Sequence, residues 1–171
     1  MPLPELGRWL LAGLFTAVVG WAAVSDARSR KIPNWTVLAI VGLFAPWAFL
    51  AGPGWALWAL AAGAGVLVVC FLLYLLGLFG AGDAKLFAAV ALFAGLGHLA
   101  ALAIDTALIG GAIALASVIT APRRALVMFQ LRAKPGDANS GVPYGVAIAL
   151  GGAIVVWGGL LNLPGPFGGV I

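Results

Sequence analysis

The sequence has 171 residues, of which 64% are hydrophobic and only 8% charged, and its mean hydropathy is +1.15. Soluble domains are about 45–50% apolar and about 25% charged, so this composition excludes both a water-soluble globular protein and a disordered chain. The net charge of +4 does not indicate nucleic-acid binding, because the basic residues flank apolar stretches, where they set topology and meet lipid headgroups. The single cysteine, Cys70, excludes an intramolecular disulfide.

Apolar stretches of membrane-spanning length follow one another along the chain. One crossing needs about 20 apolar residues, which predicts an all-α polytopic membrane protein, a bundle of six transmembrane helices in a single domain over 1–171. The predicted spans are 7–24, 35–51, 55–79, 86–103, 105–121 and 143–161. Residues 52–54, Gly-Pro-Gly, are expected to form a tight turn between the second and third spans. Length decides the division between the fourth and fifth spans, since only His98 and the pair Asp105-Thr106 interrupt that apolar run.

Basic residues gather on one side of the predicted bundle, because eight of the nine follow the first, third or fifth span. These eight are Arg28, Arg30, Lys31, Lys85, Arg123, Arg124, Arg132 and Lys134. The positive-inside rule makes that side cytoplasmic and predicts an N-out, C-out protein. The loops 25–34, 80–85 and 122–142 are then expected in the cytoplasm.

Counting residues excludes several catalytic systems. A single histidine, His98, rules out an H-E-x-x-H zinc site or a multi-histidine ligand set, and no metal or other cofactor is expected. A serine nucleophile needs a base within hydrogen-bond reach, yet Ser25, Ser29 and Ser140 fall near the cytoplasmic side and His98 toward the outer one. No phosphate-binding loop of the Walker type is present.

Two of the five acidic residues are placed where an ionised group is costly. Asp26 and Asp83 stand at the inner ends of the first and third spans, against apolar helix, and ionisable residues in such places are usually functional. Two helices separate them in sequence, so both return to the same membrane face, where bundle packing can bring them together. Asp137 lies instead in a turn-rich polar segment, where a carboxylate is readily hydrated. Glu5 and Asp105 are expected on the outer side.

Two neighbouring carboxyl groups at the edge of an apolar region cannot easily both ionise, so one keeps its proton while the other acts as a base. An aspartic protease requires this arrangement to activate a water molecule and to protonate the leaving amine. Gly80 and Gly82, just before Asp83, would let the backbone pass close to a substrate and adopt conformations closed to other residues. The alternative is that each aspartate caps a helix or pairs with a neighbouring arginine or lysine.

Three blocks of the sequence occur in order and in the expected loops. Residues 26–35 contain an aspartate, a basic stretch and Ile-Pro-Asn; residues 80–86 read Gly-Ala-Gly-Asp-Ala-Lys-Leu; residues 142–147 contain Pro-Tyr-Gly. Together they resemble the type IV prepilin peptidases, aspartic proteases of the GxGD class. The family's two catalytic aspartates correspond to Asp26 and Asp83, and its Pro-Tyr-Gly segment opens the last helix.

The resemblance implies a membrane-embedded endopeptidase of the bacterial inner membrane. Its substrate would be the helix of a prepilin or pseudopilin, such as that of Flp-type pili, cut at the cytoplasmic face behind a short basic leader. Longer family members carry a cytoplasmic domain with two Cys-x-x-Cys pairs that is associated with N-methylation. With its single cysteine this sequence resembles the peptidase-only form, and no such domain is expected. Membrane lipids are the other expected partners, and the sequence leaves the oligomeric state open.

The remaining residues of the three blocks are expected to support the site. Lys85 either favours the charged form of one aspartate or serves only as one of the basic residues that set the orientation of the protein in the membrane. Pro33 and Asn34 are expected to set the start of the second span, since proline suits the first helical turn. Tyr144, between Pro143 and Gly145, either donates a hydrogen bond into the site or anchors the helix at the membrane interface.

Other functional classes remain as alternatives. A small ion- or proton-coupled transporter could use the two aspartates, but such sites usually lie near the bilayer midplane on broken helices, and both aspartates are at the inner edge. A catalytically silent assembly protein would not need both aspartates intact. Proteases of the presenilin or signal-peptide-peptidase kind pair Gly-x-Gly-Asp with Tyr-Asp and Pro-Ala-Leu blocks, which this sequence lacks.

Overall fold

A computed structural model of the chain describes residues 3–120 and 143–161. In these residues all regular structure is helical, which confirms the all-α prediction. The helices are α1 (Leu3–Ser29), α2 (Asn34–Ala51), α3 (Pro53–Leu75), α4 (Ala81–Thr120) and α6 (Tyr144–Leu160). The first four are long and apolar enough to cross a membrane, and α6, with 17 residues, is a shorter apolar helix. The expected count of six helices is therefore not what the described residues show.

Local sequence signals explain where the early helices begin and end. Pro33 is the N-cap of α2, so it stands just before the helix rather than in its first turn. Gly52 ends α2 with φ 99°, a left-handed value that glycine adopts without strain, and Pro53 opens α3 at its first position. The predicted turn between the second and third spans is confirmed at these residues.

The expected boundary between a fourth span at 86–103 and a fifth at 105–121 is wrong. Residues on both sides of Asp105 are helical, and the backbone of α4 leaves the helical conformation at Gly95 instead, with φ 60° and ψ −175°. A Cβ on Gly95 would lie 3.2 Å from Cζ2 of Trp55. Glycine alone combines this backbone conformation with so close an aromatic ring. The polar residues predict the break at Asp105, but the residue whose backbone leaves the helical conformation is a glycine.

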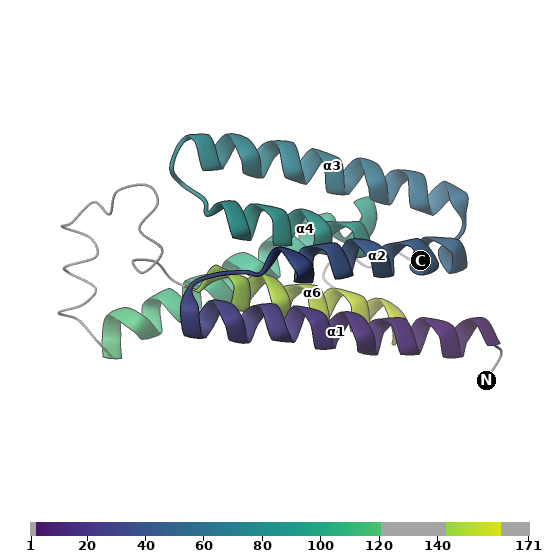
Figure 1. The fold of residues 1–171 in the computed structure, drawn as a ribbon, viewed down its shortest axis with the longest axis horizontal. Helices are drawn as coiled ribbons and strands as arrows, with labels where there is room; N and C mark the ends of the chain where they lie inside the picture. The colour runs from purple at the N-terminus through teal and green to yellow at the C-terminus, as the bar shows by residue number, and fades with distance from the viewer. Residues whose placement is uncertain (1–2, 121–142, 162–171) are drawn as a thin grey trace.

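The chain doubles back at Gly95, so that the two arms of α4, 81–94 and 96–120, run side by side (Figure 1). The ring of Tyr144 lies 6.2 Å from that of Phe79, just before the first arm, and 3.1 Å from where a Cβ of Gly110 would stand on the second. A straight helix from residue 81 to 110 would hold its two ends about 43 Å apart, so a single tyrosine ring could not contact both. These contacts therefore require the two arms to lie together.

The helices form a bundle in which α6 packs against α1 and both α2 and α3 pack against α4. The largest fully buried apolar side chains come from four helices: Phe15, Ile40, Leu86, Leu102, Ile148, Val19 and Val90. The rings of Phe15 and Phe93 lie 4.6 Å apart between α1 and α4. Small residues let these helices approach closely, as is usual for helix packing in lipid.

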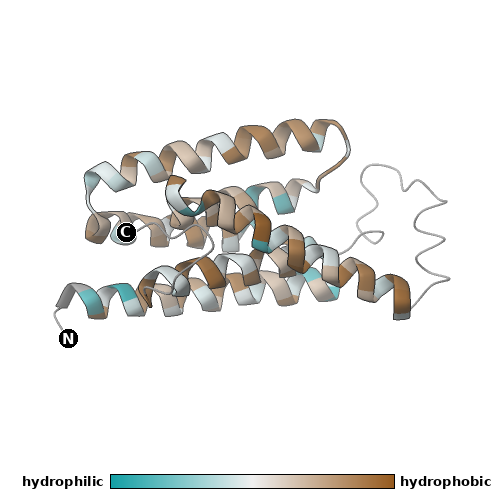
Figure 2. Ribbon diagram, turned by 180° about the vertical axis from the view of Figure 1, so that it is seen from behind, coloured by the Kyte–Doolittle hydropathy of each residue, from teal (hydrophilic) through white to brown (hydrophobic). Residues whose placement is uncertain are grey.

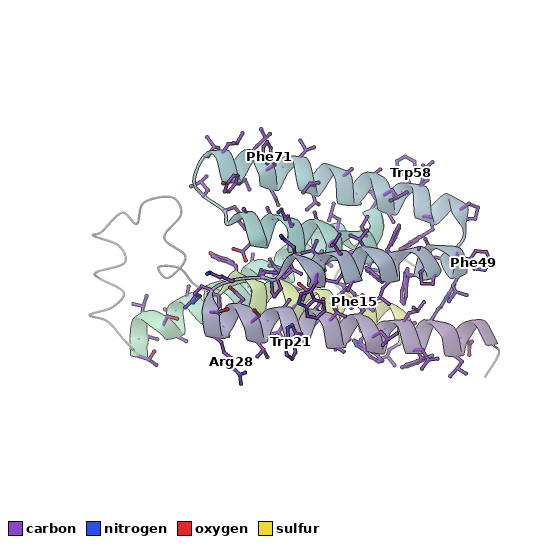
Figure 3. The ribbon with its side chains drawn as sticks, viewed as in Figure 1. Phe15, Trp21, Arg28, Phe49, Trp58 and Phe71 are labelled. Carbon is purple, nitrogen blue, oxygen red and sulfur yellow. The ribbon has the colours of Figure 1, made fainter. Side chains whose placement is uncertain are left out.

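The outside of the bundle is apolar. Figure 2 shows hydrophobic residues along every helix, and Phe49, Trp58 and Phe71 project outward from α2 and α3 (Figure 3). Phe49 is 86% exposed. Such a surface is stable in lipid and not in water, so the protein is a membrane protein.

One end of the bundle collects the segments that carry the three sequence blocks. The α1–α2 connection, the α3–α4 connection and the start of α6 all lie at this end, on the left of Figure 1. The start of α1 and the α2–α3 turn lie at the opposite end, and the chain turns back at Gly95 beside Trp55, near the start of α3. The fold therefore brings Asp26, Asp83 and Gly145 to one end, as the sequence predicts.

Candidate active site

Asp26 lies in the last turn of α1, where its side chain is buried with 6% exposure. Its Oδ2 atom accepts a 2.9 Å hydrogen bond from the backbone N–H of Gly145, the second residue of α6. The first N–H groups of a helix have no partner within it and carry the positive end of the helix dipole. The carboxylate of Asp26 therefore caps α6 from another helix.

This contact depends on the absence of a side chain at Gly145. A Cβ there would lie 2.8 Å from Oδ2 and 3.0 Å from Cγ of Asp26, which is closer than side-chain atoms approach one another. The glycine of the Pro-Tyr-Gly block thus makes room for the aspartate. Pro143 precedes the helix as its N-cap.

Asp83 lies in the first turn of α4 and is half-buried. Its carboxyl group folds back toward the start of the helix and lies against Gly80: a Cβ on Gly80 would stand only 2.6 Å from Oδ2 of Asp83. The N–H of Ala84 donates a 2.9 Å hydrogen bond to the carbonyl of Gly80 and closes this turn. The absence of a side chain at Gly80 thus leaves room for the Asp83 carboxyl group.

The two carboxyl groups are close enough for the charge of Asp26 to act on Asp83. They come from different helices, α1 and α4, and the fold places them at the same end of the bundle (Figure 1). A third group takes part in this electrostatic cluster: the guanidinium of Arg30 acts on both aspartates. Sequence reasoning named the pair, but it treated Arg30 as a topology marker or as one of three possible salt-bridge partners of the aspartates, with Arg28 and Lys85.

Gly82 has a different environment from Gly80. A Cβ on Gly82 would meet the Ile32 side chain at 3.5 Å, an ordinary van der Waals distance, so Gly82 marks where the α1–α2 connection packs on α4. Neither glycine has a positive φ; in the described residues the glycines that do are Gly52, Gly77 and Gly95. The expectation that Gly80 and Gly82 supply backbone conformations closed to other residues is therefore wrong.

The other predicted supporting residues lie around the aspartates. Lys85 and Asn34 are exposed, and the charge that acts on the aspartates is that of Arg30 rather than Lys85. The carbonyl of Pro33 accepts a 2.7 Å hydrogen bond from Oγ1 of buried Thr36 and so fixes the start of α2. These residues shape the site or stand at its edge.

The aromatic ring of Tyr144 packs against neighbouring residues. It lies beside Phe79 and over Gly110, as described above, and the described residues provide no hydrogen-bond partner for its hydroxyl group. Tyr144 thus joins the segment before Asp83 to the second arm of α4. It borders the site through packing.

Asp105 and His98, two further ionisable residues within α4, lie away from this site. Asp105 lies within the second arm of α4 beside Thr106, and His98 lies near the Gly95 turn. Among the described residues, no group of three or more histidine, cysteine or acidic side chains is arranged to hold a metal ion. Asp137, predicted to be a solvated loop residue, lies outside the described residues.

The fold and site define a helical membrane protein in which two aspartates from separate helices share one end of the bundle. The model of the type IV leader peptidase family matches residues 13–115, more than half of the chain. The chain therefore belongs to this family, and the protein is a peptidase. Comparison with curated proteins and with solved structures gives no match.

Proposed function

We propose that the protein is an aspartic endopeptidase that removes the basic leader from type IV prepilins or pseudopilins, with Asp26 and Asp83 as its catalytic pair. The observation that carries this proposal is the buried Asp26 carboxylate, held by the Gly145 N–H within the electrostatic reach of Asp83. Membership in the leader peptidase family supports the substrate class.

The proposed reaction uses the two aspartates in different roles. We assign Asp26 the base, because a backbone N–H donor and the positive end of α6 favour a negative charge there. Asp26 takes a proton from a water molecule as its oxygen attacks the peptide carbonyl, and Asp83 gives its proton to the carbonyl oxygen. Asp26 then passes its proton to the leaving amine. Asp83 recovers a proton from the hydroxyl as the carbon–nitrogen bond breaks.

The proposed membrane orientation places this site at the cytoplasmic face of the inner membrane. The connections at the site end carry Arg28, Arg30, Lys31 and Lys85, which the positive-inside rule assigns to the cytoplasm. The first arm of α4 leads away from this face and the second arm returns to it, so both termini are outside. A substrate helix reaching the site from the bilayer would have to unwind at its inner end to expose a peptide bond.

The transporter alternative is not favoured. Coupling sites of transporters usually lie near the bilayer midplane, on helices that are interrupted there. Among the described residues the interrupted helix is α4, and its break at Gly95 packs against Trp55 near the start of α3, whereas the aspartates lie at the other end of α3 and of the bundle (Figure 1). The aspartates themselves stand in a last and a first helical turn.

The test is cleavage of a tagged prepilin co-expressed with the protein, followed by the mobility shift of the pilin on a gel. Asp26→Asn and Asp83→Asn should each reduce cleavage by at least about a hundredfold, since each removes one proton-transfer step. Glu5→Gln, at the exposed opposite end of α1, is the matched control and should cleave normally. Near-normal processing by either aspartate variant would rule out the aspartic mechanism.

A further inference from the structure

The turn that follows Asp26 holds one residue in an unfavourable conformation. Arg30 has φ 53°, and among the described residues it is the one non-glycine residue with a positive φ. This backbone region costs an ordinary side chain on the order of 1 kcal/mol, which glycine or asparagine would largely avoid. An arginine in this place indicates that its side chain contributes something there.

Hydrogen bonds fix the turn on both sides of Arg30. Its N–H donates a 2.8 Å bond to the carbonyl of Asp26, and the Ser25 hydroxyl donates a 2.8 Å bond to the carbonyl of Lys31. Two residues after Arg30, Ile32 packs against Gly82 in the Gly-x-Gly-Asp block. The turn therefore bridges the two helices that carry the aspartates.

Arg30 also differs from the other cations at this end. It is half-buried, whereas Arg28, Lys31 and Lys85 are exposed, and Arg28 projects away from the bundle in Figure 3. The helices α2, α3 and α6, which complete the bundle, contain no acidic or basic residue. The described charged groups that act on the aspartates are thus the aspartates themselves and Arg30.

We propose that Arg30 is a positioning residue of the catalytic pair: the strained turn presents its guanidinium to both Asp26 and Asp83. The inference rests on the proposed function and extends it. A pair of carboxyl groups that shares one proton carries one negative charge, and one nearby cation balances it in a low-dielectric site. Without this cation, the first ionisation of the pair is harder and requires a higher pH.

The experiment separates the charge of Arg30 from its backbone conformation. Arg30→Asn removes the charge but keeps a residue that tolerates positive φ, so folding should be retained. Arg30→Lys keeps the charge, and Lys31→Asn removes an exposed charge from the same turn as the matched control. The readouts are the pH profile of prepilin peptide cleavage and the pH dependence of dicyclohexylcarbodiimide labelling, which modifies protonated carboxyl groups, at Asp26 and Asp83 by mass spectrometry.

Arg30→Asn should move the labelling midpoint of the pair, and the acid limb of the cleavage profile, upward by about one pH unit. Arg30→Lys should recover at least half of that shift, and Lys31→Asn should change the midpoint by less than about 0.2 unit, as an exposed and screened charge does. An unchanged midpoint in Arg30→Asn, or an equal shift in Lys31→Asn, would overturn the proposal. Because labelling requires no turnover, it decides the role of Arg30 even if no prepilin is cleaved, and that failure would count against the proposed function alone.

Discussion

The carboxylate of Asp26 accepts a 2.9 Å hydrogen bond from the backbone N–H of Gly145, a residue 119 positions further along the chain. This single contact joins the end of α1 to the start of α6. It explains why a Pro-Tyr-Gly block accompanies the two aspartate blocks: proline begins the helix, and glycine lets the carboxylate reach the first N–H groups. The third block therefore orients one of the two proposed catalytic groups.

Replacement of Gly145 tests this relationship. In Gly145→Ala the new Cβ would clash with the Asp26 carboxylate, so we expect cleavage to fall at least tenfold and stability to fall by about 1–3 kcal/mol. Stability can be followed in detergent micelles with a fluorogenic maleimide, since Cys70 is buried and reacts on unfolding. Gly158→Ala in the same helix, where a Cβ meets nothing within 4 Å, should behave as wild type. Equal behaviour of the two variants would contradict this role for Gly145.

The two glycines before Asp83 should respond differently to substitution. In Gly80→Ala the Cβ would stand 2.6 Å from the Asp83 Oδ2 atom and displace the carboxyl group, which should lower kcat at least tenfold with little change in unfolding temperature. In Gly82→Ala the Cβ would make ordinary contact with Ile32, so the carbodiimide labelling of Asp83 should match wild type. Normal cleavage by Gly80→Ala would show that this close approach does not position Asp83.

The fold class followed from the sequence because its signals are strong and local. Apolar stretches of crossing length and the Gly-Pro-Gly turn at 52–54 required no knowledge of tertiary contacts. The Gly95 break could not be located in the same way. The residues that adjoin Gly95 in the sequence are apolar, and the polar His98 comes three positions later. The Trp55 ring that leaves no room for a side chain at Gly95 lies 40 positions earlier in the chain and meets Gly95 only in the folded bundle.

The candidate site was predictable to a similar depth. The sequence shows that Asp26 and Asp83 lie next to apolar helices, where an ionised carboxyl group is costly. Because two helices separate them, the sequence also predicts that both lie at the same end of the bundle. The role of Arg30 was not visible, because four basic residues lie in or next to these connections and composition cannot tell which one turns inward. The signal is its φ of 53°, a property of the folded backbone.

Gly95 should be intolerant of substitution for a purely conformational reason. Its combination of φ 60° and ψ −175° costs other residues about 1–3 kcal/mol, and a Cβ would also press on the Trp55 ring. Gly95→Ala should therefore unfold several degrees earlier than wild type in the Cys70 maleimide assay. Gly97→Ala, with open space around its Cβ, is the control, and an equally large loss there would show that helix packing in general, rather than the turn, is sensitive.

The proposed topology and the doubling back of α4 predict which positions face each side of the membrane. In a Cys70→Ala background, single cysteines replace Lys31 at the site end, Gly54 at the opposite end and Gly97 just after the Gly95 turn, all three at exposed positions. A membrane-impermeant maleimide added to spheroplasts should label positions 54 and 97 at once and position 31 only after permeabilisation. The reason is that the basic connections stay in the cytoplasm, while the α2–α3 turn lies at the other end of the bundle (Figure 1) and the Gly95 turn packs beside Trp55, near the start of α3. Labelling of position 31 in intact spheroplasts would reverse the orientation and place the aspartates on the wrong side to meet a cytoplasmic leader. Labelling at 54 but not at 97 would keep the orientation and instead show that the first arm of α4, at 81–94, stops short of the outer surface.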